Sequence, residues 1–285
     1  MIGGVKLFYL ATNLIDLIWL TKRRCLTLRE KRYFDIIVNI PLEEELLAFL
    51  GVFEHSEDLS TNAQYRCAVQ TGTDLTMLVV LQDDMGKSSA ANSATEALAE
   101  FSCSLFICLG IAGGLSKDLK LGDVCYSGNV LDVNDNAKTT DSGKNAIDLE
   151  LSPYTYRTDK TLSLALDFVR RDPTFRDKYV EWQQVRLARA GELGLNEITD
   201  KNGQNPQEPI PKSMGGTIVC GVVSAGNNYN DKLKQIDRKV LAIETESGGV
   251  FNVAGRKNVE ALTIRESPTM RIQTKLSSNP ARRML

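Results

Sequence analysis

Short apolar runs recur along this chain, separated by polar turns or by segments with helical spacing. A continuous apolar run bounded by turn residues is typical of a strand that is buried on both faces of a sheet. Leu105–Leu109 is the clearest example, because Gly110, Gly113 and Gly114 follow it at once. Further strands are predicted at Phe34–Ile40, Asp123–Val130, Gly216–Ser224 and Val259–Ile264, and a hairpin at Tyr65–Gln70 and Leu75–Leu81.

The segments between these runs favour helices. Pro41 ends the first strand, and Leu42–Leu47 begins a helix, since proline is well tolerated at a helix start. The small residues after Gly86 (SSAANSATEALAEF) predict a helix that sits close against a sheet. Thr158–Leu193 is helical in pattern and is broken into two helices at Pro173. At 285 residues, the chain can hold one large α/β domain or two small ones.

The middle of the chain shows no recognisable chemistry. Leu131–Pro153 is polar and is expected to be a surface loop, and Lys201–Lys212 is rich in proline and asparagine, as exposed loops are. We interpret residues 150–212 as a divergent helical insert in a domain that spans residues 33–285. The sequence does not say whether the insert forms a pocket rim or an oligomer contact.

The N-terminal segment stands apart from this domain. Val5–Leu20 is strongly apolar and is followed by Lys22, Arg23 and Arg24. It is shorter than the roughly 20 residues that span a bilayer, and Asn13 and Asp16 interrupt it. We expect residues 1–32 to form an apolar helix with a basic linker, packed on the domain or on a partner. A membrane-surface anchor is the alternative, and the pattern of a signal peptide is missing.

Composition narrows the class of protein. The net charge of −2 argues against a nucleic-acid-binding surface. The six cysteines form no CxxC motif and no disulfide framework, which favours a reduced, cytoplasmic protein. The single histidine, His55, lies in the polar stretch EHSEDLS and is interpreted as a solvated loop residue. No metal site is visible in the sequence.

The motifs MGK at 85–87, GIAGGL at 110–115, GDV at 122–124 and IETES at 243–247 follow one another in this order. This order resembles the nucleoside phosphorylase/nucleosidase superfamily, over roughly Asp35 to Arg265. GIAGGL looks closest to the methylthioadenosine/S-adenosylhomocysteine nucleosidase branch. The resemblance implies a three-layer α/β fold with a central mixed β-sheet flanked by helices. It also implies cleavage of an N-glycosidic bond without a cofactor, by a homo-oligomer.

Two glutamates carry the chemistry that the resemblance implies. Nucleosidases place an acidic residue in the first strand-to-helix turn to activate water, and that role falls on Glu45. Three acids in a first helical turn also stabilise a helix dipole, so a structural role stays open. Glu44 lies one register away from Glu45 in the same triplet. In IETES, Glu246 takes the position of the carboxylate that accepts hydrogen bonds from the ribose 2′ and 3′ hydroxyls. Glu244 and Thr245 accompany it, with Thr245 in place of a methionine under the sugar.

Other residues are predicted to line the same pocket. Gly86 and the free amides of its helix start could hold an anion or ribose oxygens, while Lys87 is interpreted as a solvated first-turn charge. A glycine-rich loop lets the backbone approach a ligand, which predicts contacts from Ile111, Ala112 and Gly113. Relatives carry an aromatic turn after the strand at 216–224. The corresponding candidates here are Ser224, Asn228 and Tyr229, although AGNNYND is also a good turn sequence in its own right.

The resemblance fails at the C-terminus. Relatives place an aspartate after the last strand, which protonates the purine, but the corresponding position here is Thr269. Glu266 could replace it only if the turn is remodelled. Hydrolysis of a purine nucleoside or nucleotide is therefore the first hypothesis. A catalytically impaired domain that binds a nucleoside or nucleotide as a sensor, and a phosphate-dependent phosphorylase, are the alternatives.

Overall fold

The computed structural model describes residues 31–267, apart from 54, 72–74, 121, 134, 136–137, 142–146, 170, 193–210 and 225. The main sheet has 11 strands in the order β2-β3-β4-β1-β5-β13-β7-β11-β12-β6, with β10 paired to β7. Its strands are β1 (Arg32–Ile40), β2 (His55–Asp58), β3 (Arg66–Gln70), β4 (Thr76–Leu81), β5 (Phe101–Ile111), β6 (Gly113–Gly114), β7 (Val124–Asp132), β10 (Tyr154–Arg157), β11 (Ser213–Cys220), β12 (Val240–Glu244) and β13 (Glu260–Glu266).

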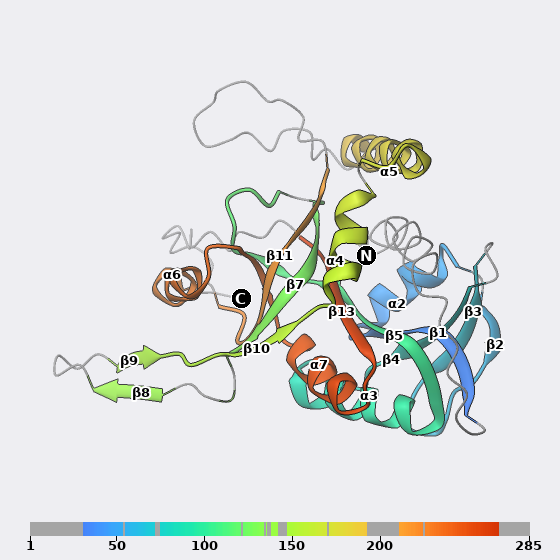
Figure 1. Cartoon of the computed structure of the whole chain (residues 1–285), viewed down its shortest axis with the longest axis horizontal. Helices are drawn as coiled ribbons and strands as arrows, with labels where there is room; N and C mark the ends of the chain where they lie inside the picture. The colour runs from blue at the N-terminus through green and yellow to red at the C-terminus, as the bar shows by residue number, and fades with distance from the viewer. Residues whose placement is uncertain are drawn as a thin grey trace, which may run out of the picture.

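Helices cover both faces of this sheet (Figure 1). On one face, α3 (Lys87–Glu100) and α7 (Ser247–Arg256) bury small residues such as Ala94 and Ala254 against Phe106 of β5. On the other face, α2 (Glu43–Leu50), α4 (Lys160–Phe168) and α5 (Pro173–Glu192) share a core with Ile107 and Ile264. A further helix, α6 (Asn227–Ile236), follows β11.

The sheet is mixed, and it closes on itself at one end. The strands β4, β1, β5 and β13 are parallel, whereas β13 and β7 are antiparallel. After Ala112, the chain leaves β5 and continues directly into β6, where Gly113 pairs with Ile243 of β12. In the sheet, β13, β7 and β11 lie between β5 and β12. The pairing of β12 with β6 therefore places β12 beside the end of β5 as well. The expected three-layer fold with a central mixed β-sheet is confirmed.

Several predicted elements are confirmed with shifted bounds. The strands at 34–40 and 105–109 lie within β1 and β5, and the hairpin is the antiparallel pair β3–β4. The helical pattern breaks at Pro173, where α5 begins. Strand β5 is longer than its apolar core, because β1 pairs with it from Phe101 onward and β13 pairs with it as far as Ile111.

Other expectations are wrong. The predicted loop at 131–153 contains β8 (Lys138–Asp141) and β9 (Ile147–Glu150), which pair with each other as a separate sheet. The strand predicted to reach Ser224 ends at Cys220, because its neighbours end at Asp132 and Glu244 and leave nothing to pair with. Residue His55 is exposed, as expected, but it lies in β2 rather than in a loop.

Two of the predicted segments are the helical insert and the apolar N-terminal segment. The insert at 150–212 contributes α4 and α5, but it also adds β10 to the main sheet. The apolar segment Val5–Leu20 lies outside the described residues. Within the described ranges, no helix is both long and apolar enough to cross a membrane.

Candidate active site

Three segments that are distant in sequence meet at the end of β5. Helix α2 brings Glu45, the turn between β12 and α7 brings Glu244 and Glu246, and the end of β13 brings Arg265. All four side chains are buried, at 5%, 2%, 4% and 0% exposure. Charges are rarely buried to this extent without partners, so the contacts among them define the site.

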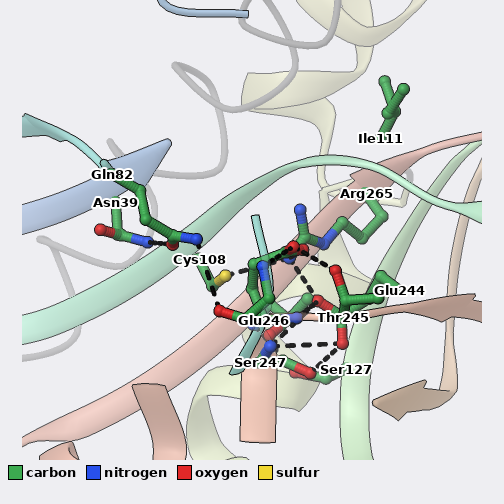
Figure 2. Close-up of polar contacts among 12 residues, drawn as sticks. Asn39, Gln82, Cys108, Ile111, Ser127, Glu244, Thr245, Glu246, Ser247 and Arg265 are labelled. Carbon is green, nitrogen blue, oxygen red and sulfur yellow. Dashed lines mark hydrogen bonds and ion pairs between the residues drawn. The ribbon is translucent and has the colours of Figure 1, made fainter. Parts of the chain in front are cut away.

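Arg265 joins the acids from β12 and the following turn (Figure 2). Its Nη2 donates to Glu244 in a short ion pair, to Glu246 Oε2 at 3.2 Å and to Cys108 Sγ at 3.0 Å. In register, Arg265 lies beside Gly110 of β5. The sequence offered one signal for this residue, a charge that directly follows the apolar run ending at Ile264. A charge in a buried strand requires a buried partner.

The hydrogen-bonding capacity of the Glu244 carboxylate is used by groups of the protein itself. Its carboxylate accepts from the backbone N–H of Glu246 at 3.0 Å and of Ser247 at 3.0 Å, and from the Ser247 hydroxyl. These donors are the first amides of α7, whose partial positive charge favours a carboxylate. Burial raises the pKa of Glu244, and Arg265 opposes that shift. Glu244 therefore anchors Arg265 and the helix start, whereas the sequence had predicted that it contacts substrate.

Glu246 is held from three sides. Its Oε1 accepts from the backbone N–H of Gly86 at 3.0 Å and from the Thr245 hydroxyl, and its Oε2 accepts from Arg265. Burial raises the pKa of Glu246, but Arg265 and these hydrogen bonds outweigh burial and lower it overall. The carboxylate is therefore ionised at neutral pH. The Gly86 amide, predicted to hold a ligand, is used to orient Glu246.

Glu45 differs from the other two acids. Its Oε1 accepts from the backbone N–H of Ile111 at 2.8 Å, whereas its buried Oε2 has no hydrogen-bond partner among the described residues. Burial raises the pKa of Glu45 to about 7, more than Arg265 and the Ile111 amide lower it. Near neutral pH this carboxyl group can either hold or release a proton. The hydrogen-bonding capacity of Oε2 is therefore available to a water molecule or a ligand that enters the site.

The rest of the glycine-rich loop serves mainly to close the sheet. The Ala112 N–H donates to the carbonyl of Glu266 at 3.0 Å, and Gly113 pairs with β12. The Ile111 side chain is 39% exposed, so it lies at the surface beside the buried acids. Of the three predicted loop contacts, Ile111 therefore combines an exposed side chain with an amide bonded to Glu45.

The AGNNYND segment is a helix start, and the expectation of a turn is wrong for most of it. Asn228 and Tyr229 lie in the first turn of α6, because the Asn230 N–H bonds to the Gly226 carbonyl at 3.1 Å. The Ser224 hydroxyl accepts from the Gly226 N–H at 3.0 Å. Tyr229 is half-buried against the cluster that contains Val133 and Leu233, and Asn228 is exposed. The structure places these three predicted residues at or just before the start of α6.

Glu266 and Lys87 also differ from expectation. Glu266 is buried and follows Arg265 in β13, so strand alternation directs it to the face of Ile264, opposite Arg265. Thr269 lies outside the described residues. Lys87 is not a solvated charge, because its Nζ lies 2.6 Å from the buried Asp132 and also pairs with Asp135. Helix α3 starts beside the end of β7, which brings this lysine to those acids.

The fold is shared with solved nucleosidase structures. The chain is similar to 5′-methylthioadenosine/S-adenosylhomocysteine nucleosidase from Neisseria meningitidis, in complex with methylthio-immucillin-A, at 19% identity and a TM-score of 0.54; the match covers 81% of this chain and 84% of that one. The nucleosidase from Helicobacter pylori, with butyl-thio-DADMe-Immucillin-A, gives 16% identity, a TM-score of 0.56 and coverage of 84% and 85%. A futalosine hydrolase mutant of Helicobacter pylori gives 16% identity, a TM-score of 0.54 and coverage of 83% and 89%.

A comparison with curated protein sequences gave no significant match. The sequence model of one family, the phosphorylase superfamily, matches residues 35–266, which include every strand from the body of β1 to the end of β13. This chain belongs to the phosphorylase superfamily.

Proposed function

We propose that this protein hydrolyses the N-glycosidic bond of a purine nucleoside or nucleotide. The observation that carries the proposal is the free Oε2 of Glu45, on a carboxyl group whose pKa lies at about 7. A general base works best when its pKa is near the working pH. The nucleosidases of similar fold, solved with methylthio-immucillin-A and butyl-thio-DADMe-Immucillin-A, support a nucleoside as the ligand.

In this proposal, Glu45 takes a proton from water while the water oxygen attacks the anomeric carbon of the ribose. The N-glycosidic bond breaks, its electron pair leaves with the base, and the base takes up a proton from solvent water, while Glu45 returns the proton of the attacking water to solvent. Such reactions pass through an oxocarbenium-like state that a nearby carboxylate stabilises. Ionised Glu246, at the same site, supplies that negative charge.

Glu246 also has the capacity to bind the sugar. A carboxylate offers about four acceptor positions, and three protein donors bind Glu246. Rotation of the Thr245 hydroxyl would free one more position, so that two adjacent ribose hydroxyls could bind. This requirement matches the predicted role of Glu246, with Thr245 as its partner.

Water is favoured over phosphate as the nucleophile by the charge of the site. Three buried carboxyl groups and one guanidinium leave an excess of negative charge when all are ionised. An anion brought close to them is repelled, and burial strengthens that repulsion. We also propose a cytoplasmic homo-oligomer, and the absence of a CxxC motif or a disulfide framework in the sequence supports the reducing compartment.

The test measures the free base that is released from adenosine, inosine, guanosine, 5′-methylthioadenosine and AMP. The reaction runs in phosphate-free buffer, and chromatography detects the base. We expect free base without phosphate, and a loss of about 10²- to 10⁴-fold in turnover for Glu45→Gln with binding retained. Glu44→Gln, on the exposed side of the same helical turn, is the matched control. Strict dependence on phosphate would identify a phosphorylase. Binding without base release would favour the sensor alternative.

A further inference from the structure

Buried polar side chains form one hydrogen-bonded series next to the candidate active site. It runs from Arg66 through Gln64, Ser93 and Asn39 to Gln82, all of them 5% exposed or less. The links are Arg66 Nε to Gln64 Oε1 at 2.7 Å, Gln64 Nε2 to Ser93 Oγ at 2.8 Å, Ser93 Oγ to Asn39 Oδ1 at 2.7 Å and Asn39 Nδ2 to Gln82 Oε1 at 2.8 Å. Figure 2 shows the last link.

The hydrogen bonds of this series all run in one direction, from donor to acceptor. The Arg66 guanidinium can only donate, so the carbonyl oxygen of Gln64 must face it, and each following amide is oriented in turn. At the far end, Gln82 Nε2 donates to the backbone carbonyl of Asp84 and, at 3.5 Å, to that of Gly86. Carbonyl oxygens only accept hydrogen bonds. The two ends of the series therefore enforce the same orientation of the Asn39 and Gln82 side-chain amides.

The two carbonyls that Gln82 holds flank the peptide group between Met85 and Gly86. The N–H of that peptide is the one that donates to Glu246 Oε1 at 3.0 Å. Residues Asp84 and Met85 are exposed, and Gly86 has a φ of 106°, a conformation that favours glycine. Glycine leaves this backbone free to rotate, so contacts from other residues set its orientation. The Ala90 N–H of α3 holds the Gly86 carbonyl at 3.0 Å, and Gln82 holds the carbonyl of Asp84.

We propose that Asn39 and Gln82 are positioning residues for Glu246, which they orient through the Gly86 amide. The proposal rests on the function proposed above, since it takes Glu246 as the group that binds the ribose hydroxyls. Buried polar networks that are fully satisfied make the local structure rigid, and a break in one link leaves a buried group unpaired. The link from Asn39 to Gln82 thus ties a loop that is otherwise exposed to the buried strand β1.

The decisive variant is Asn39→Asp, which keeps the shape but replaces the donor to Gln82 with an acceptor. We expect hydrogen exchange at the Gly86 amide, followed by NMR, to become at least tenfold faster. Ser93→Ala is the matched control, since it removes the hydrogen bonds of Ser93 and leaves the hydrogen bond from Asn39 to Gln82 in place. Exchange at Gly86 should then stay within about twofold of the wild type. Gln82→Met tests the same point if Asn39→Asp does not fold. Unchanged exchange at Gly86 in every folded variant would overturn the proposal.

Ligand binding separates this proposal from the proposed function. For Asn39→Asp, the affinity for adenosine should fall about tenfold, while that for 2′,3′-dideoxyadenosine should not change. In a Glu246→Gln background, Asn39→Asp should have no further effect on adenosine. Equal losses for both ligands, or additive losses in the double variant, would overturn the positioning role. If Glu246→Gln alone leaves adenosine binding unchanged, the sugar-binding role fails instead, and the exchange experiment still decides the inference.

Discussion

The carboxylate of Glu45 and the guanidinium of Arg265 meet over the backbone of Gly110. A Cβ atom at residue 110 would lie 3.0 Å from both oxygens of Glu45 and closer still to Arg265 Nη1. The space above this glycine is therefore filled by two charged groups from opposite ends of the domain sequence. The glycine is required here because of close approach, since its φ is not in the positive range.

Gly110→Ala is expected to reduce base release by about 10²-fold, because a displacement of catalytic groups by an ångström has an effect of that size. The added methyl group must push aside either the proposed base or its cationic neighbour. Gly255→Ala is the matched control, since a Cβ at residue 255, within α7, has nothing within 4 Å. Equal rates for the two variants would mean that the Glu45–Arg265 geometry does not limit turnover.

The rate of base release should rise with pH and level off above a pH of about 7. The reason is that burial raises the pKa of Glu45 to about 7, and only the ionised carboxylate can accept a proton from water. The measurement is kcat/KM from pH 5 to 9 for the wild type and for Glu45→Gln. The residual rate of the variant should lack this inflection. The same inflection in both proteins would assign it to another group.

The stability of the protein should also depend on Glu45. Its pKa is raised from 4.5 when unfolded to about 7 in the folded protein, so the folded state binds more protons between these values. This contribution to stability is fully present below pH 4.5 and is lost as pH rises through 7. Relative to Glu45→Gln, the wild type should therefore lose about 3 kcal/mol in its free energy of unfolding between pH 4.5 and 8. Urea unfolding of both proteins across this range provides the test, and parallel pH profiles would contradict it.

Arg265→Met should destabilise the protein by about 3–5 kcal/mol at pH 8, because Glu244 and Glu246 would remain buried without their cation. The pKa of Glu246 is lowered in the folded protein, so its ion pair stabilises the fold at high pH and is lost as pH falls. The difference between Arg265→Met and the wild type should therefore shrink towards pH 4. Arg265→Lys keeps the charge and should show a smaller loss. An Arg265→Met protein as stable as the wild type at pH 8 would refute the pairing.

Local patterns were sufficient for most of the fold. Apolar runs mark the strands because burial on two faces excludes polar residues, and this identified β1, β5 and the β3–β4 hairpin. Proline marks the start of α5 because its ring disrupts the preceding turn. The family resemblance, which rests on four short motifs, correctly implied the three-layer arrangement.

The candidate site was predicted in part. Glu45 and Glu246 were identified by their motifs, and the structure brings both into one buried cluster with Arg265. Arg265 was not predicted, because a single charge after an apolar strand is buried or exposed according to partners that are distant in sequence. Asn39 and Gln82 gave no signal, since a single amide in or beside an apolar strand has no periodicity of its own.

By itself, the sequence determined the central strands β1, β5 and β13, the β3–β4 hairpin, the helices α2 to α5 and the two acids Glu45 and Glu246. Only the tertiary structure decided what those acids contact: Gly113 pairs with Ile243, and this pairing brings Glu244 and Glu246 to Arg265 and Glu45. The physical reason is that strand patterns depend on neighbours in sequence, whereas register, burial of charge and the pKa of a carboxyl group depend on groups distant in sequence. The ionisation of Glu45, on which its proposed role depends, is therefore a property of the folded site alone.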